Sequence, residues 1–130
     1  MIALTLPWPP SVNRYWRHPS RGPLVGRTLL SEDGRHYRAL AKFTLAEQNV
    51  PAGFLRGRIA IEITAHPPDR RARDLDNMLK APLDALTHSG VIRDDADIDD
   101  LRITRGDVVP NGRVYIVLRD ASTNPQECST

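Results

Sequence analysis

A strand that leads into a helix through a charged turn constrains the fold of this chain more than any other feature. Residues 58–65 place Ile59, Ile61 and Ile63 at every second position, the pattern of a strand with one apolar face. Residues 75–86 carry apolar side chains at the three- and four-residue spacing of a helix. In a chain of 130 residues, the size of one ordinary domain, this order predicts a single globular domain that contains strands and helices.

Sequence patterns on both sides of this unit predict further elements. Ser31 is a good N-cap for the helix that follows it, although Gly34 weakens the start of that helix. The alternation of apolar residues breaks near Asp100, which indicates a bulge in the strand there. We expect strands over residues 2–6, 28–30, 97–105 and 113–119, a helix over 32–48, and a hairpin turn at Pro110-Asn111-Gly112 between the last two strands.

Two segments near the N-terminus are expected to be irregular. Three prolines within residues 7–13 remove amide donors and force extended backbone, which excludes a helix and the interior of a sheet ladder. Residues 14–27 mix cations with aromatics and turn formers, which indicates a surface loop suited to phosphate contacts and base stacking. The domain is expected to cover residues 1–120, and the polar residues 121–130 are expected to form a flexible tail.

Composition excludes several classes of protein. A hydrophobic fraction of 40% with 26% charged residues argues against disorder, and no apolar run approaches the roughly 18 to 20 residues needed to span a bilayer. The stretch from Met1 to Leu6 is too short for the core of a signal peptide, so we expect a cytoplasmic protein without a membrane partner. The single cysteine, Cys128, excludes an intrachain disulfide and a thiolate metal site.

The charges of this chain are segregated, although its formal net charge is only +2. Basic side chains crowd residues 14–38 and 70–73, whereas five aspartates fall within residues 94–100. Segregation of this kind indicates an organised electrostatic field rather than a uniformly solvated surface.

The turn and helix at residues 69–84 concentrate the candidate catalytic residues. Asp74 and Asp76 point to the same side only if the backbone between them is extended, so Asp74 must precede the helix and Asp76 must lie at its first turn. The two carboxylates can then share one cation. Lys80 lies four residues after Asp76, on the same helix face and within reach of the group that this carboxylate binds.

Purely structural roles are the alternative for these residues. An aspartate before a helix is more often a cap than a ligand, and Lys80 has the option of an ordinary ion pair with an aspartate one turn away. However, a second carboxylate two residues away is superfluous for capping, and three upstream arginines are costly neighbours unless they bind anions. A calcium-binding loop that starts at Asp74 is excluded, because its required glycine and acid fall on Leu79 and Ala85.

The ligand types indicate which metal such a site binds. Oxygen ligands without histidine or cysteine favour Mg²⁺ over zinc, and Mn²⁺ is the expected substitute. A metal of this kind activates a water and neutralises a phosphate, while a lysine stabilises the oxyanion, which together fit phosphodiester hydrolysis. Asp94 and Asp95 are the expected additional ligands, whereas most of the second acidic cluster is expected to be solvated. The roles of Asp97, Asp99 and Asp100 stay open.

Three ordered motifs resemble the RusA-type Holliday junction resolvases, a family of small endodeoxyribonucleases often carried by phages and prophages. The first is Leu-Pro-Trp-Pro-Pro-Ser-Val-Asn-Arg-Tyr-Trp-Arg at residues 6–17. The second is Pro-Asp-Arg-Arg-Ala-Arg-Asp-Leu-Asp-Asn at residues 68–77, which continues through Lys80 to Leu-Asp-Ala-Leu at residues 83–86. The third is Asp94-Asp95. The resemblance covers most of the chain.

The resemblance implies a compact α+β fold with a mixed sheet and flanking helices. It also implies a homodimer that binds four-way junction DNA and nicks two strands symmetrically with divalent metal, and a twofold dimer matches the symmetry of a junction. It places the family's essential carboxylates on Asp74, Asp76 and Asp95 and its catalytic lysine on Lys80, with Asp94 at the adjoining acidic position. The basic residues that we expect to contact DNA phosphates are Arg14, Arg17, Arg21, Arg27, Arg70, Arg71 and Arg73.

One departure from the family pattern is Pro82, which is expected to remove a backbone hydrogen bond from the helix after Lys80 and to bend it. Two rival interpretations stay open. One is a nuclease for other branched nucleic acids, because the metal chemistry is the same. The other is an inactive junction-binding protein, such as a prophage relic, although the filled catalytic positions argue against it. The cleavage sequence preference and the number of metal ions also stay open.

Overall fold

The computed structural model describes residues 1–53, 55 and 57–121. Residues 122–130 of the predicted tail, Cys128 among them, therefore lie outside the described residues. No helix within the described part of the chain is long and apolar enough to cross a membrane. The elements in chain order are β1 (Ile2–Pro7), α1 (Val12–Tyr15), β2 (Trp16–Arg17), β3 (Leu29–Leu30), α2 (Glu32–Glu47), β4 (Ile59–His66), the 3-10 helix η1 (Leu75–Met78), α3 (Lys80–His88), the 3-10 helix η2 (Asp95–Asp97), β5 (Ile98–Arg105) and β6 (Arg113–Asp120).

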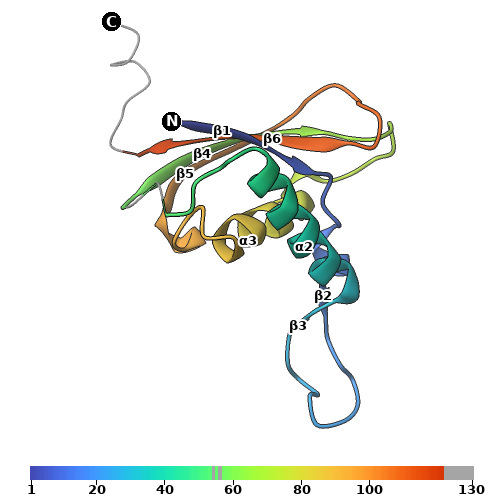
Figure 1. Ribbon diagram of the computed structural model, residues 1–130. Helices are drawn as coiled ribbons and strands as arrows, with labels where there is room; N and C mark the ends of the chain where they lie inside the picture. Colours follow the sequence, from blue (N-terminus) through green and yellow to red (C-terminus); the bar gives the residue numbers. More distant parts are fainter. Residues whose placement is uncertain (54, 56, 122–130) are drawn as a thin grey trace, which may run out of the picture.

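A mixed sheet with helices on one of its faces forms the body of the molecule (Figure 1). Its strand order is β1-β6-β4-β5, in which β4 and β5 are parallel and the other pairs are antiparallel. The helices α2 and α3 pack on the face to which the isoleucines of β4 point, which confirms the expected α+β fold with flanking helices. The core is built from Leu4, Leu6, Ile61, Ile63, Ile116 and Leu118 of the sheet and Tyr37, Ala41, Leu45, Ala85 and Leu86 of the helices.

The expected hairpin between the last two strands is wrong. Both β5 and β6 pair with β4, which lies between them, and they do not pair with each other. The tight turn itself is present, because the amide of Gly112 donates to the carbonyl of Val109 at 3.0 Å and Asn111 has a φ of 66°. Turn chemistry fixes where the chain reverses locally, whereas the pairing of strands depends on the whole sheet.

The expected bulge near Asp100 is confirmed. In the parallel pair, Ile59 lies opposite Ile98 while Ala60 lies opposite Asp100, so Asp99 is an extra residue on β5. This shift changes the face to which the side chains before and after it point. The aspartates before the bulge and those after it therefore do not follow one alternation of faces.

The expectation that prolines exclude a helix and the interior of a sheet ladder from residues 7–13 is wrong only at the end of the segment, where α1 begins. Pro7 is the last residue of β1 and lies opposite Arg113, which is tolerated because β1 is an edge strand. Val12 and Asn13 begin the short helix α1, with Ser11 at its N-cap position. Helix α1 follows the prolines, so it loses no amide donor to them.

The helix expected over residues 75–86 is divided into η1 and α3, which begins at Lys80. Pro82 therefore falls in the first turn of α3, where amides have no acceptor within the helix, and it removes no helical hydrogen bond. The amide of Leu83 donates to the carbonyl of Leu79 at 3.2 Å, so helical hydrogen bonds resume directly after Pro82, and the bend stays a prediction.

A long connection between β2 and β3 projects from the body of the molecule (Figure 1). We call residues 18–28 the β2–β3 loop. All of its residues except Pro19 are exposed, as expected for this stretch. The surface-loop expectation for residues 14–27 is wrong at its start, because Tyr15 ends α1 with 0% of its surface exposed and Trp16 begins β2.

Candidate active site

The charged turn after β4 is held in place from both sides. The amide of Arg71 donates to the carboxylate of Asp69 at 3.0 Å, and a guanidinium nitrogen of Arg73 lies 2.7 Å from the same carboxylate. From β5, Arg105 donates to the carbonyl of Arg73 at 2.7 Å. The contact with the Arg73 guanidinium, followed by the hydrogen bond from the Arg71 amide, holds the pKa of Asp69 below its usual range because both stabilise the ionised carboxylate. The turn thus presents the residue that follows it, Asp74, in a defined position.

Asp74 stands at the N-cap position of η1, but its side chain does not cap the helix. Its backbone is extended, with φ −87° and ψ 129°, and its side chain makes no capping hydrogen bond to η1. Asp76 lies in the first turn of η1, and both aspartates are exposed. Leu75, between the two aspartates, already belongs to η1, so the backbone is extended at Asp74 alone and the shared cation stays a prediction.

Lys80, four residues after Asp76 in the sequence, contacts the second acidic cluster. Its side-chain nitrogen lies 3.6 Å from Oδ2 of Asp95, and both side chains are about two-fifths exposed, at 41% and 40%. The same nitrogen lies 5.7 Å from the centre of the Trp16 ring, on β2. The start of α3, the start of η2 and the root of the β2–β3 loop therefore meet at one place.

The structure divides the five aspartates of residues 94–100 by their partners. Asp97 is buried and accepts two hydrogen bonds from Arg93, at 3.1 and 3.0 Å. Asp99 accepts from the Nε of Arg58 at 2.8 Å, and Asp100 lies 3.6 Å from Arg119. These three carboxylates therefore have structural ion pairs. Of the remaining two, Asp95 contacts Lys80 and Asp94 is its neighbour in the sequence.

Asp94 also caps η2, because its Oδ1 accepts from the amide of Ala96 at 2.9 Å. That hydrogen bond, followed by the contact with the Asp95 carboxyl, holds the pKa of Asp94 below its usual range. Among the described residues, no three histidine, cysteine or acidic side chains are grouped tightly enough to enclose a metal ion. Exposed carboxylate oxygens still fit Mg²⁺, which takes one or two protein carboxylates and completes its shell with waters and substrate phosphates.

A partly buried network one turn after Lys80 was missed by sequence reasoning. Asp84, one turn after Lys80 on α3, accepts two hydrogen bonds from Arg38 of α2, at 2.7 and 3.1 Å, and a third from the hydroxyl of Tyr15. Burial raises the pKa of Asp84, but the hydrogen bonds from Arg38 and Tyr15 outweigh burial and lower it. Burial and the bond to Asp84 raise the pKa of Tyr15. The network locks α1, α2 and α3 together around the lysine.

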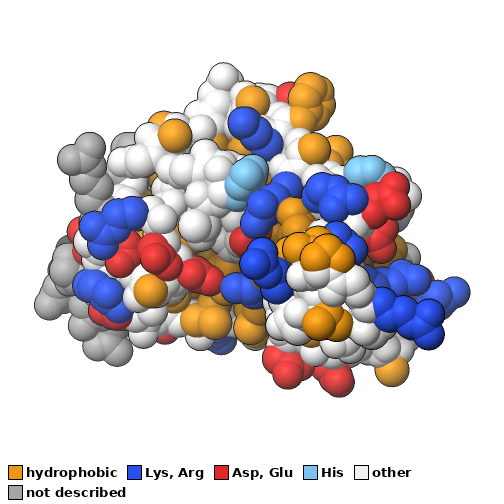
Figure 2. Space-filling model, turned by 90° about the horizontal axis from the view of Figure 1, so that it is seen from below, with side chains coloured by type: hydrophobic (Ala, Val, Ile, Leu, Met, Phe, Trp, Pro, Cys, Tyr) orange, Lys and Arg blue, Asp and Glu red, His pale blue; other side chains and the backbone are white. Residues whose placement is uncertain are grey.

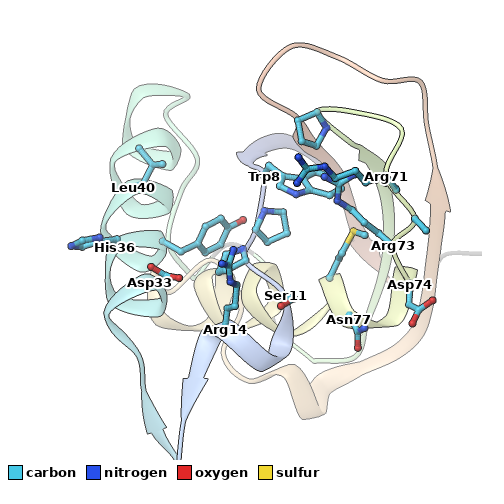
Figure 3. Close-up of a pocket in the computed structure, with 16 residues that line it drawn as sticks. Trp8, Ser11, Arg14, Asp33, His36, Leu40, Arg71, Arg73, Asp74 and Asn77 are labelled. Atoms are coloured by element: carbon cyan, nitrogen blue, oxygen red, sulfur yellow. Dashed lines mark hydrogen bonds between the residues drawn. The ribbon is translucent and has the colours of Figure 1, made fainter.

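A cleft of about 920 Å³ begins at Asp74. Helix α2 forms one wall with Leu40, and the charged turn forms the other (Figure 3). The guanidinium of Arg73 lies 5.5 Å from the centre of the Trp8 ring. Of the seven arginines expected to contact phosphates, the cleft is lined by Arg14, Arg71 and Arg73.

The other four expected arginines lie outside the cleft. Arg21 and Arg27 are in the β2–β3 loop, Arg17 is at its root, and Arg70 is exposed in the charged turn. Figure 2 looks onto the face from which the loop projects, where many Lys and Arg side chains gather near the middle and on the right, and acidic side chains lie on the left and also at the right and lower edges. The site and the basic surface thus share one side of the molecule.

Carboxylates and a lysine lie beside an arginine-lined cleft on a mixed sheet with flanking helices, an arrangement suited to binding and cleaving a phosphodiester. The chain belongs to the RusA family, because the family model described as endodeoxyribonuclease RusA matches residues 7–119.

Several relatives carry the name crossover junction endodeoxyribonuclease RusA. The protein from Escherichia coli (strain K12) is 41% identical over 118 residues, which cover 91% of this chain and 93% of the relative. The proteins of Enterobacteria phage 82 and Enterobacteria phage HK97 are 41% and 40% identical, over 90% and 88% of this chain and 92% and 91% of the relatives. The segment matched by the family model, residues 7–119, includes every candidate site residue.

Proposed function

We propose that this chain is a structure-selective DNA endonuclease that resolves Holliday junctions by symmetric, metal-dependent phosphodiester hydrolysis in DNA recombination and repair. The relatives named crossover junction endodeoxyribonuclease supply the junction as substrate. The observation that carries the proposal is the contact of Lys80 with Asp95, which unites two acidic segments beside a basic cleft. The phage relatives support an origin in a phage or prophage, and we expect the protein to act in the cytoplasm.

Each side chain has a role in this proposal. Asp74, Asp76 and Asp95, with Asp94 beside them, would hold Mg²⁺ or Mn²⁺, which when bound lowers the pKa of water and offsets phosphate charge. Lys80 donates to an oxygen of the scissile phosphate, and its contacts with Asp95 and Trp16 limit its positions before the substrate binds. The arginines of the cleft hold the backbone of the DNA strand that leads to Asp74.

A homodimer completes the proposed reaction. One site of this kind cuts one strand, whereas resolution of a four-way junction needs two symmetric cuts. A dimer with a twofold axis presents two sites with the symmetry of the junction itself. Sedimentation velocity of the purified protein, with and without junction DNA, tests this part separately from catalysis.

The deciding experiment is cleavage of a synthetic four-way junction in the presence of Mg²⁺. The wild type should introduce paired nicks, and Asp76→Asn should bind the junction and leave it intact. Asp107→Asn is the matched control, because Asp107 is an exposed aspartate after β5 that does not line the cleft. Flap and three-way substrates in the same assay distinguish a nuclease for other branched DNA. If the wild type binds junctions but never cuts them, the protein is an inactive junction-binding protein and the enzyme proposal is refuted.

A further inference from the structure

The tip of the β2–β3 loop has a defined conformation. Two successive turns form it, in which the amide of Val25 donates to the carbonyl of Gly22 at 3.2 Å and the amide of Arg27 donates to that of Leu24 at 3.1 Å. Gly22 and Gly26 have φ values of 86° and 82°, a conformation that suits glycine. Leu24 and Val25 are thereby held at the end of the projection.

Apolar side chains form the tip of the β2–β3 loop, and cationic side chains flank it. Leu24 and Val25 are 37% and 54% exposed and belong to no part of the core. Three arginines, Arg17, Arg21 and Arg27, flank them, and residues 14–31 contain no aspartate or glutamate. Exposed apolar side chains on a basic element are the combination with which proteins insert between DNA bases while binding the phosphates on either side.

The root of the loop is fixed to the candidate active site. Trp16, the residue at which β2 begins, packs its ring edge-on against Tyr15 at 5.0 Å and lies 5.7 Å from the side-chain nitrogen of Lys80. On the other arm, the amide of Ser31 donates to the carbonyl of Tyr15 at 3.0 Å. Both arms are therefore held beside the lysine, so DNA at the site also lies within the basic surroundings of the loop (Figure 2).

We propose that the β2–β3 loop is a wedge, in which Leu24 and Val25 enter the branch point of the DNA and contact bases that are unstacked there. Arg21 and Arg27 contact the flanking phosphates. A linear duplex offers no unstacked step at its centre, so the tip contributes to selection of branched over linear DNA. The inference rests on the proposed function, because that function supplies the branched substrate.

The test uses a four-way junction with 2-aminopurine at the branch point and a linear duplex of the same length, with Ca²⁺ in place of Mg²⁺. Binding of the wild type should raise the 2-aminopurine fluorescence. The double variant Leu24→Ser/Val25→Ser should lose this rise and bind the junction about ten-fold more weakly, equivalent to ~1.4 kcal/mol, with unchanged affinity for the duplex. Both positions are exposed, so its thermal unfolding should match that of the wild type.

Leu101→Ser/Val108→Ser is the matched control, since it removes two apolar side chains of similar exposure, 42% and 44%, from elsewhere on the surface. Wild-type fluorescence and affinity in the tip variant would overturn the wedge, as would an equal loss on junction and duplex. A changed sedimentation coefficient would also overturn it, because the tip would then contact a second copy of the chain. Failure of the wild type to cut any branched substrate with Mg²⁺ is a different result and refutes the proposed function instead.

Discussion

The side-chain nitrogen of Lys80 lies 3.6 Å from a carboxylate oxygen of Asp95, across the crossover that joins β4 to β5. The two residues come from the first turn of α3 and the first residue of η2, which meet only because the parallel strands on either side are paired. The candidate site is therefore assembled by the sheet. Neither acidic segment has this arrangement by itself.

Replacement of Lys80 by methionine should lower the rate of junction cleavage by about 10²- to 10³-fold, because one preorganised cation at the phosphate is lost. Binding of the junction should change little, since the cleft arginines remain. Single-turnover cleavage measures the rate, and a gel-shift assay measures binding. Lys42→Met is the matched control, because Lys42 is the other lysine of the sequence and is exposed on α2. Equal rates in the two variants would remove Lys80 from the mechanism.

Removal of divalent metal should abolish cleavage and leave the fold intact. With EDTA the protein should still unfold at its usual temperature, because the core and ion pairs of the described residues involve no metal. Mg²⁺ or Mn²⁺ should restore cleavage, whereas Zn²⁺ should not, since the candidate ligands are all carboxylates. Cleavage that persists after exhaustive chelation would contradict the proposed chemistry.

Asp84→Ala should destabilise the fold by about 3 kcal/mol, because the hydroxyl of the buried Tyr15 and the guanidinium of Arg38 both lose their partner. The side chains of Arg38 and Asp84 are 28% and 16% exposed, which limits access of replacement water. Urea unfolding measures the change. Glu47→Ala removes an exposed carboxylate from the last turn of α2 and should cost almost nothing. Similar losses in both variants would mean that the network is not structural.

The contribution of Asp84 should depend on pH in a defined direction. Its pKa in the folded protein lies below the ordinary value of 3.8, so the unfolded chain takes up the proton more readily. The stabilisation is therefore fully present above pH 3.8 and is lost as the pH falls through the folded-state pKa. The difference in unfolding free energy between wild type and Asp84→Asn should shrink on acidification. A difference that stays constant from pH 7 to pH 3 would rule out this account.

Gly34→Ala should destabilise the protein, although helix propensity alone predicts a gain of about 1 kcal/mol. A Cβ at this position would lie 2.6 Å from the carbonyl oxygen of Tyr15 and 2.7 Å from a methyl of Leu30. Overpacking of this kind costs about 1 to 3 kcal/mol. Thermal unfolding decides the sign, and His36→Ala, an exposed change in the same helix, is the control.

Gly34 also illustrates what sequence reasoning could and could not find. Periodicity located β4 and α2 within a few residues, because each pattern is a local property of the chain. The close approach of Tyr15 to Gly34 joins segments whose contact no local pattern encodes. The same holds for the pairing of β5 and β6 with β4.

The residues of the candidate site show the same contrast between local patterns and contacts of distant segments. Asp74, Asp76 and Lys80 were predicted from their spacing, which depends only on local backbone geometry. The partner of Asp99 was not, because Arg58 approaches it only after β4 and β5 have paired. Arg93, the hydrogen-bonded partner of Asp97, lies four residues before it, and this local pair was also missed. Sequence alone therefore recognised an acidic cluster and could not separate its ion-paired members from those that face Lys80.

Strand β1 runs antiparallel to β6 with Ile2 opposite Leu118, so the two ends of the described chain are neighbours. A short peptide from Ala121 back to Met1 would close the backbone, and the ring could be reopened between Pro23 and Leu24. Such a circular permutant interrupts no strand of the main sheet and no core helix, so it should retain the native fold. It would convert the projecting loop into two free ends while the fold is kept. The effect of the loop on DNA selection could then be measured apart from its effect on the fold.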